Sequence, residues 1–374
     1  MNILINASNL SGGGGGQVAD SICRHLKEFA SHRFIVVLSS AFDSTIDAIR
    51  SYDNVIVKQY DYPKRDVRSF ITLRNSYLDN IVFEYGIECV YTIFGPMKWK
   101  PKCHHICGFA LAHVVMQESP YFQIMGFIER LKWKLHIKVW EMIFRRSSNC
   151  FITENPLVTK RLKEKFHNSQ VYTITNYYNQ VFDNIAFQER MVLPPFNGVT
   201  ILSIGTNYPH KNLIITTEVA KNLKRDYPNI NFRFILTIDE TEFPTLDSDI
   251  KDCFVFVGKI SVNKCPSLYE QVDIAFVPTL LECFTAAYPE AMRMGVPIVT
   301  TDLEFSNGLC EDAAIYYNAL DASDAAQKLY LLMSDSKFRD DLIFCGKKKL
   351  LTFDNNIDRI TKLIRLCEQG SKLN

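Results

Sequence analysis

Short apolar runs alternate with longer stretches of helical periodicity along most of the chain. Apolar runs of this length are typical of strands that are covered on both faces, as in parallel sheets. The runs that we interpret as strands are residues 1–6, 35–38, 55–59, 89–93, 105–107, 151–154, 171–175, 199–204, 232–237, 254–257, 274–277 and 297–300. Because helical stretches separate many of these runs, the pattern predicts an α/β fold with parallel sheets.

The length of the chain indicates two domains, because 374 residues exceed what one hydrophobic core usually holds. Residues 183–198 include two adjacent prolines and have the pattern of a linker. We therefore expect an N-terminal domain at residues 1–182 and a C-terminal domain at residues 199–374. After the last predicted strand the pattern becomes helical, and the helices that we expect there are residues 321–333, 337–350 and 356–366.

Residues 123–147 combine two apolar stripes in one segment. On a helix, an aliphatic stripe lies on one face, formed by Ile124, Ile128, Leu131, Leu135, Val139 and Met142. Trp133 and Trp140 lie on the opposite face, with Ile137 and Phe144, and basic residues border them, namely Arg130, Lys134, Lys138 and Arg145. We expect the aliphatic stripe to face the core and the tryptophan stripe to contact an anionic membrane surface. Two alternatives stay open: both stripes could be buried between helices, or the alternation in residues 131–139 could form a strand.

The composition is that of an ordinary globular protein, 47% hydrophobic and 22% charged. The formal net charge of +1 argues against nucleic acid as the main partner. The chain opens directly on a predicted strand, without the pattern of a signal peptide, and it has no uninterrupted apolar run long enough to span a membrane. Its 11 scattered cysteines are typical of a reducing compartment. We therefore expect a cytoplasmic protein, or one that binds peripherally to the inner face of the cytoplasmic membrane.

Residues 273–302 carry the main candidate chemistry. A predicted strand leads into an acidic loop and a short helix, which we expect to begin near Phe284 and to end at Gly295, and then into a second strand. Ligands bind at the carboxyl ends of strands in such sheets, so we expect Glu282 to point into a crevice. The backbone amides beside it belong to Cys283, Phe284, Thr285 and Ala286. Unpaired amides at a helix start favour an anion.

A second carboxylate, Glu290, lies eight positions after Glu282. At the rise of a helix this corresponds to about 12 Å, close to the length of a sugar, a diphosphate and a ribose laid end to end. One carboxylate can accept hydrogen bonds from hexose hydroxyls and the other from ribose hydroxyls, while the amides hold the phosphates. The pair therefore predicts a nucleotide-sugar site, with Glu282 on the hexose and Glu290 on the ribose.

Five consecutive glycines, residues 12–16, follow the first predicted strand and precede a helix that we expect to begin near Gln17. Glycines permit a tight turn and let amides approach a phosphate, and the candidate phosphate contacts are Gly13, Gly14 and Gly15. A Walker loop would end in Gly-Lys-Ser or Gly-Lys-Thr, which is missing. A dinucleotide fold would place an acid after the second strand, where the chain has Ser39-Ser40. A flexible turn without a ligand stays open.

A second glycine loop, residues 205–212, follows the strand predicted at residues 199–204. It begins with Gly205 and reaches Lys211, which we expect to start a helix. There the Lys211 ammonium and the nearby amides could both contact a diphosphate, and a charge-assisted hydrogen bond of this kind contributes about 1.5–3 kcal/mol.

These motifs resemble the signature of the family 4 retaining glycosyltransferases. The signature is a Glu, seven further residues, Glu-Ala-Met, then Gly-x-Pro and a hydrophobic strand, and it is matched here by Glu282, Glu290-Ala291-Met292, Gly295 and Pro297. The resemblance implies a GT-B fold, in which two Rossmann-like domains with parallel sheets face each other across a cleft. It also implies a nucleotide-diphosphate sugar as donor, retention at the anomeric carbon, and no cofactor or metal.

The resemblance extends to further positions. It implies that the glycine-rich loop of the first domain faces the cleft, that His113 lies near the transferred sugar, with His104 and His105 as competing candidates, and that Gly258, Lys259 and Ile260 line the base pocket. Residues 205–212 resemble the phosphate-gripping loop of the family, although Thr206 stands where the family usually has an Arg. In many family members the last helix returns to the first domain.

Two segments resemble metal sites but are not favoured as such. Residues 103–107 contain two cysteines and two histidines but lack a partner pair at zinc-finger spacing, so a buried strand is the preferred interpretation. Residues 247–249 read Asp-Ser-Asp, and their neighbourhood indicates a surface loop.

The sequence therefore predicts a retaining, metal-independent hexosyltransferase, with Glu282, Lys211 and His113 as catalytic candidates. The expected acceptor is a saccharide hydroxyl, and the basic aromatic segment favours a lipid-linked oligosaccharide of O-antigen or capsule assembly. The alternatives are a sugar-nucleotide epimerase of the same fold, which needs no acceptor, and a non-catalytic nucleotide-sugar-binding protein.

Overall fold

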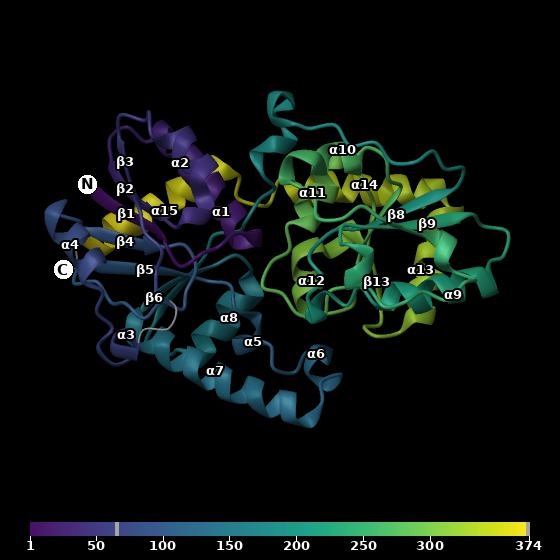
Figure 1. Cartoon of the computed structure of the whole chain (residues 1–374), viewed down its shortest axis with the longest axis horizontal. Helices are drawn as coiled ribbons and strands as arrows, with labels where there is room; N and C mark the ends of the chain where they lie inside the picture. Colours follow the sequence, from purple (N-terminus) through teal and green to yellow (C-terminus); the bar gives the residue numbers. More distant parts are fainter. Residues whose placement is uncertain (64–66, 372–374) are drawn as a thin grey trace. The chain divides into compact units, whose positions relative to one another are not determined.

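The computed structural model describes residues 1–63 and 67–371, with the side chains of residues 67 and 68 left out. The chain divides into two compact units. The first unit consists of Met1–Val115, Gly126–Asn176 and Asp354–Asn374, and the second of Met116–Met125 and Tyr177–Phe353. Each unit is built around its own parallel sheet, which confirms the α/β fold with two parallel-sheet domains (Figure 1).

The sheet of the first unit has the strand order β3-β2-β1-β4-β5-β6-β7. Its strands are β1 (Asn2–Ala7), β2 (Arg33–Leu38), β3 (Val55–Gln59), β4 (Cys89–Thr92), β5 (His104–Phe109), β6 (Cys150–Thr153) and β7 (Gln170–Thr173). The sheet of the second unit has the order β10-β9-β8-β11-β12-β13. Its strands are β8 (Val199–Ser203), β9 (Phe232–Leu236), β10 (Phe254–Phe256), β11 (Ile274–Val277), β12 (Ile298–Thr301) and β13 (Ala314–Tyr317). Both orders are those of a doubly wound sheet, whose ligands bind where the strand order reverses.

The helices of the first unit are α1 (Gly13–Arg24), α2 (Asp43–Ile49), α3 (Val67–Thr72), α4 (Ser76–Glu84), α5 (Ala112–Val115), α7 (Phe127–Ser147), α8 (Pro156–Lys165) and α15 (Asn356–Ser371). Those of the second unit are α6 (Pro120–Gln123), α9 (Ile215–Asp226), α10 (Cys265–Tyr269), α11 (Ala287–Met294), α12 (Glu304–Cys310), α13 (Ala322–Ser334) and α14 (Ser336–Leu350). The last three helices of the chain confirm the helices predicted at residues 321–333, 337–350 and 356–366. The prediction that the chain is helical beyond residue 302 was wrong for Ala314–Tyr317, which forms the additional strand β13 beside β12.

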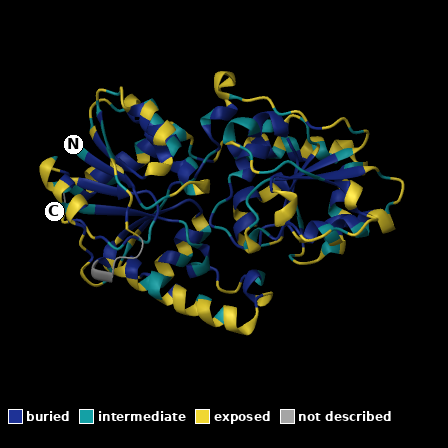
Figure 2. Ribbon diagram, in the orientation of Figure 1, coloured by how far each residue is buried: buried dark blue, intermediate teal, exposed yellow. Residues whose placement is uncertain are grey.

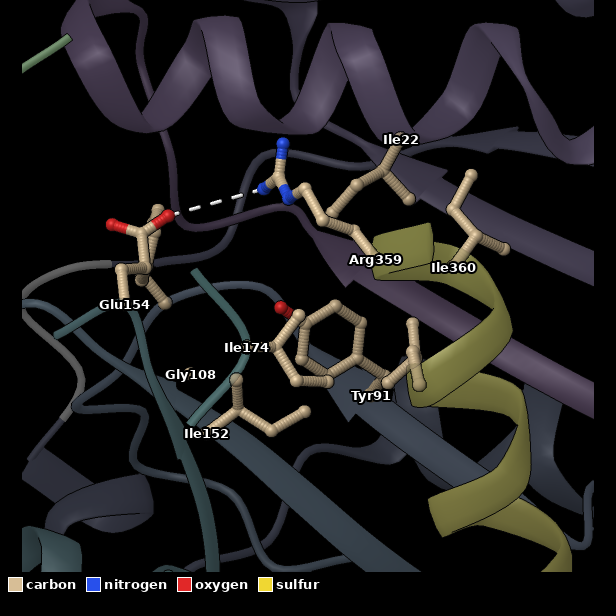
Figure 3. Close-up of a pocket in the computed structure, with 10 residues that line it drawn as sticks. Ile22, Tyr91, Gly108, Ile152, Glu154, Ile174, Arg359 and Ile360 are labelled. Atoms are coloured by element: carbon tan, nitrogen blue, oxygen red, sulfur yellow. Dashed lines mark ion pairs between the residues drawn. The ribbon is translucent and has the colours of Figure 1, made fainter. Parts of the chain in front are cut away.

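The last helix, α15, packs in the first unit against β4, β5 and α1 (Figure 1). Its apolar side chains Ile360, Leu363 and Cys367 are buried in the core beneath the sheet. Arg359 of the same helix is also buried and lies 3.9 Å from Glu154, measured from Nη2 to Oε1. Both groups line a cavity of about 20 Å³, which is large enough for one water molecule. Figure 3 shows the Glu154 carboxylate and the Arg359 guanidinium pointing toward each other.

Helix α1 begins at Gly13, four residues before the start near Gln17 that the sequence predicted, so that prediction was wrong. Glycine is a poor helix former, and a local rule therefore places these residues in a turn. Tertiary packing explains the difference for two of them. A Cβ on Gly15 would lie 3.4 Å from the Phe94 ring, and one on Gly16 would lie 3.7 Å from the Phe42 ring. The start of the helix is therefore held close to neighbouring aromatic side chains.

Helix α7 confirms the helical interpretation of the two-stripe segment, but the two stripes are reversed with respect to the prediction. The stripe that carries the tryptophans faces the protein: Ile137 and Phe144 are buried, and Trp133 and Trp140 are half-buried. The aliphatic stripe that was predicted to face the core is largely exposed (Figure 2). The sequence could not decide which face of α7 is buried, because both faces are apolar. The neighbouring strands and helices pack against the aromatic face. Phe144 packs 5.0 Å from Phe109, between ring centroids.

Candidate functional site

The candidate site of the second unit lies where its strand order reverses. β8 and β11 are paired at the centre of the sheet, with Ile201 opposite Ile274, and the chain leaves β8 toward one edge of the sheet and β11 toward the other. Two loops therefore start side by side at the carboxyl ends of these strands. One loop contains Gly205 and Lys211, and the other contains Glu282.

The loop after β8 begins with a glycine that the backbone requires. Gly205 has a φ of 145°, which a residue with a Cβ rarely adopts, and its amide donates to Thr237 Oγ1 over 2.9 Å. A Cβ built at Gly205 would lie 3.9 Å from Lys211 Cε, so the two residues are neighbours. Lys211 does not start an α-helix, contrary to the sequence prediction. It ends a 3₁₀ turn, Pro209–Lys211, and Asn212 after it is left-handed, with a φ of 52°.

Lys211 and Glu282 form an ion pair between Nζ and Oε1. The two side chains are only 18% and 13% exposed, so water screens the pair weakly. The second carboxylate oxygen, Glu282 Oε2, is buried without a hydrogen-bond partner in the described part of the chain. A buried carboxylate oxygen normally accepts a hydrogen bond, and a ligand hydroxyl is a suitable donor.

Glu290 lies in the first turn of α11 and is 4% exposed. Burial raises the pKa of its carboxyl to about 7, although the hydrogen bond from Tyr269 and the nearby charge of Lys211 both act to lower that pKa. Tyr269 donates from its hydroxyl to Glu290 Oε2 over 3.2 Å. Lys211 therefore lies near both acids: it is ion-paired with Glu282, and its charge acts to lower the pKa of Glu290.

The segment after Glu282 enters α11 later than predicted. The helix begins at Ala287, not near Phe284, and ends at Gly295 in the left-handed conformation, with a φ of 69°, as the sequence predicted. Among the described residues, the amides of Phe284, Thr285 and Ala286 donate no hydrogen bond to another backbone or side-chain group. These amides precede the positive end of the helix dipole, where an anion is favoured.

The carbonyl of His210 ties the two loops together. It accepts hydrogen bonds from the Leu280 amide, over 2.7 Å, and from Thr279 Oγ1, over 3.2 Å. The His210 ring is largely buried, and this burial, together with the charge of Lys211, lowers its pKa to about 4. The ring is therefore neutral at pH 7, and Lys211 is the cation beside Glu282.

Sequence reasoning missed Tyr269 and the carbonyl of His210. Tyr269 ends α10 in an apolar stretch, so its pattern is that of a core residue. A backbone carbonyl gives no signal in a sequence. The pairing of β8 with β11 brings the His210 carbonyl to the acidic loop, and the packing of α10 against α11 brings Tyr269 to Glu290.

The other predicted site residues lie on other loops and helices, although Ile260 packs against the core cluster that contains Tyr269 and Ala287. Gly258, Lys259 and Ile260 follow β10, which is separated from β8 by β9. Gly13, Gly14 and Gly15 form the first turn of α1 in the first unit. There His113 stacks on Trp133, with ring centroids 4.3 Å apart. The roles of these residues in binding the donor or the acceptor stay predictions.

Neither metal-like segment forms a metal cluster. In residues 1–63 and 67–371, no three His, Cys, Asp or Glu side chains are grouped closely enough to hold a metal ion. His105 is instead a structural residue of β5, with Nε2 3.0 Å from Thr92 Oγ1 and Nδ1 2.9 Å from the Ser147 carbonyl. Asp247 pairs with Lys221 over 2.8 Å.

Comparisons with known proteins agree with this geometry. Residues 198–335, which contain the whole candidate site of the second unit, match the family model described as "Glycosyl transferases group 1". The O-antigen chain mannosyltransferase RfbU of Salmonella typhimurium is 22% identical over 246 residues, 63% of this chain and 65% of the relative. The chain thus spans 65% and 55% of the length of the two curated relatives that it matches.

Solved structures share the fold over nearly the whole chain. A glycosyltransferase from Rickettsia africae has a TM-score of 0.72 at 14% identity, and the match covers 100% of this chain and 99% of that one. HepE from Anabaena, solved in complex with UDP, has a TM-score of 0.65 at 12% identity, covering 98% and 99%. At this identity the similarity establishes the fold, which is GT-B. This chain is therefore similar to the group 1 glycosyltransferases over residues 198–335, and it shares the GT-B fold over nearly its whole length.

Proposed function

We propose that this protein transfers a hexose from a nucleotide-diphosphate sugar to a saccharide hydroxyl, with retention at the anomeric carbon and without a metal ion. One observation carries the proposal: Lys211, Glu282 and Glu290 converge at the reversal point of the second sheet. A cation between two carboxylates, beside unpaired amides, suits a ligand that combines a diphosphate with hydroxyl groups at both ends.

The roles follow from the charge that develops as the donor bond breaks. Negative charge builds on the diphosphate leaving group, and the sugar ring becomes positive. Lys211 and the amides of Phe284, Thr285 and Ala286 would stabilise the diphosphate, which is electrostatic catalysis by groups held in place before the reaction. Because Glu282 already holds Lys211, the ammonium needs little reorganisation when a phosphate arrives.

The two carboxylates would orient the ends of the donor. Glu282 Oε2 would accept a hexose hydroxyl, and Glu290 would accept the ribose hydroxyls. Glu290 is an acceptor on both oxygens only when it is ionised. Since its pKa is about 7, donor binding is expected to strengthen as the pH rises through 7.

The acceptor follows from the curated relative, whose name states that it acts on the O-antigen chain. We propose a lipid-linked oligosaccharide of bacterial polysaccharide assembly as the acceptor, handled by a peripheral protein at the inner face of the cytoplasmic membrane. In the described part of the chain, no helix is both long and apolar enough to cross a membrane.

A donor screen tests the proposal first. Thermal unfolding is recorded with a panel of UDP, GDP and dTDP sugars, and a true donor raises the unfolding temperature by mass action. Release of nucleoside diphosphate is then measured with and without a saccharide acceptor. Release that requires the acceptor supports transfer. Interconversion of the donor without acceptor identifies an epimerase, and binding without turnover identifies a binding protein.

Two variants test the residues. Lys211→Ala and Glu290→Ala are each expected to lower transfer by about 100- to 1,000-fold, the loss typical of removing one group that stabilises a transition state. Lys221→Ala is the matched control, because Lys221 is a lysine of the same unit that pairs with Asp247 at the surface. Circular dichroism checks that all three variants are folded. Full activity in either site variant contradicts the assignment.

A further inference from the structure

Helix α7 presents an apolar face to solvent. We define this apolar face as Phe127, Ile128, Leu131, Leu135 and Met142. The first four are between 61% and 82% exposed, and Met142 is 38% exposed. Figure 2 shows α7 with long exposed stretches along its outer side. Single exposed apolar residues are common, but a row of them along about four turns of one helix marks an interaction surface.

The helix cannot hide this face by rotating, because its opposite face is fixed in the first unit. Phe144 is fully buried between Phe109, Phe151 and Phe166. Near the other end of the helix, Trp133 stacks on His113 with an angle of 7° between the rings. These contacts anchor both halves of α7 by its aromatic stripe. The apolar face is therefore a fixed outer surface of the first unit.

Lysines border the apolar face on both sides. At 100° per residue, Lys134 and Lys138 lie near one edge of the face and Lys132 lies beyond the other edge. All three are exposed. The acids of the helix do not balance them, since Glu141 is paired with Lys165 over 2.6 Å and Glu129 is the remaining carboxylate.

The arginines at the end of α7 do not contribute to this border. Arg145 donates to the Lys165 carbonyl over 2.6 Å, and Arg146 donates to the carbonyls of Phe70 and Ile71 over 3.1 and 2.6 Å. Their guanidinium groups thus serve to fix the helix. The charge that faces outward beside the apolar face is that of the three lysines.

We propose that α7 docks on an anionic lipid bilayer through this apolar face. The helix would lie in the plane of the interface, with its apolar side chains among the lipid chains and its lysines extended to the phosphates on both sides. Cations on both edges of one apolar face match a flat layer of anionic headgroups, which reaches both edges at once. The contact reverses the sequence prediction, in which the tryptophan stripe touched the membrane.

This inference deepens the proposed function. It rests on that function only for the purpose of the membrane contact, which would be to hold the protein beside a lipid-linked acceptor. The docking surface lies in the first unit, whereas the Lys211–Glu282 pair lies in the second. Lipid binding and donor binding can therefore be measured separately, and either can fail without the other.

Vesicle flotation with the full chain tests the inference. Phosphatidylcholine vesicles are compared with vesicles that contain about one third phosphatidylglycerol. The wild type is expected to float with the anionic vesicles at low salt and to bind neutral ones weakly, because juxtamembrane lysines contribute through the surface potential. Changing Lys132, Lys134 and Lys138 to Gln should weaken the binding about fivefold per lysine. Absence of flotation by the wild type overturns the inference.

The apolar contribution is tested by Leu131→Ser with Leu135→Ser, which should reduce binding at least about tenfold because two exposed leucines no longer enter the lipid. The matched control is Phe83→Ser on α4, since Phe83 is 90% exposed in the same unit but outside α7. Retained binding in the leucine variant, or an equal loss in the control, overturns the inference. A dimer of the wild type that the leucine variant dissolves, seen by light scattering, also overturns it. The donor-induced thermal shift should be the same in all these variants.

Discussion

The buried pair of Glu154 and Arg359 gives a prediction that can be worked out from the structure. The two groups face each other across the small cavity under α15 (Figure 3). Burial raises the pKa of the Glu154 carboxyl from 4.5 to about 7, and the nearby Arg359 guanidinium opposes this rise. Burial also lowers the pKa of Arg359. The perturbation that separates these effects is Arg359→Met, which keeps an apolar side chain of similar length in the core.

The direction in which stability changes with pH follows from proton binding by Glu154. The folded state of the wild type binds the Glu154 proton more tightly than the unfolded state does, so stability falls as the pH rises from 4.5 to about 7 and is flat above that value. The rise in pKa corresponds to about 3 kcal/mol over this range, at about 1.4 kcal/mol per pH unit. Without Arg359 the pKa of Glu154 moves higher still. The stability of the variant therefore continues to fall above pH 7, by up to about 1.4 kcal/mol per pH unit.

Urea unfolding at pH 6, 7 and 8 measures the difference. All three tryptophans, Trp99, Trp133 and Trp140, lie in the first unit, so their fluorescence reports the unfolding of that unit. Lys362→Met on the same helix is the control, because Lys362 pairs with Asp354 and its side chain is 48% exposed, so its loss removes a partly solvated ion pair away from the small cavity. A difference between wild type and Arg359→Met that is the same at pH 6 and pH 8 would refute the reasoning.

Three further predictions concern single side chains. Tyr269→Phe removes the hydrogen bond that lowers the pKa of Glu290, so the pH midpoint of donor affinity, measured by calorimetry, should move above 7; an unchanged midpoint argues against Glu290 as a donor ligand. Gly205→Ala should weaken donor binding about tenfold while the protein stays folded, because a Cβ strains a backbone with a φ of 145°; wild-type affinity would contradict a role of this loop. Gly108→Ala should lower the unfolding temperature of the first unit by several degrees at least, since its Cβ would lie 1.7 Å from the Ile93 carbonyl oxygen; an unchanged temperature would show that the strands can move apart.

The local pattern of the chain predicted the elements of the candidate site well. The short apolar runs at residues 199–204, 274–277 and 297–300 are strands of one parallel sheet. Gly295 ends α11 in a left-handed conformation, which a glycine adopts without strain. These features depend on a few adjacent residues, and for that reason they can be read from the sequence.

Helix starts were less predictable because several local signals compete there. The glycines of residues 13–16 have a low intrinsic preference for helix, yet α1 includes them, and two of them, Gly15 and Gly16, lie close to aromatic rings. The turn at Pro209–Lys211 places Lys211 before α9 and not at its start, since the left-handed Asn212 interrupts the backbone. In each case a contact or a turn beyond the local pattern decided the boundary.

By itself, the sequence determined the alternation of strands and helices, the two parallel sheets and the acidic motif from Glu282 to Glu290. Only the tertiary structure decided that Lys211 meets Glu282, because the pairing of β8 with β11 brings together the loops that follow these two central strands. It likewise decided which side of α7 faces outward. A helix with apolar residues on both faces carries no local signal for its orientation, which depends on the side chains that the neighbouring strands and helices offer to it.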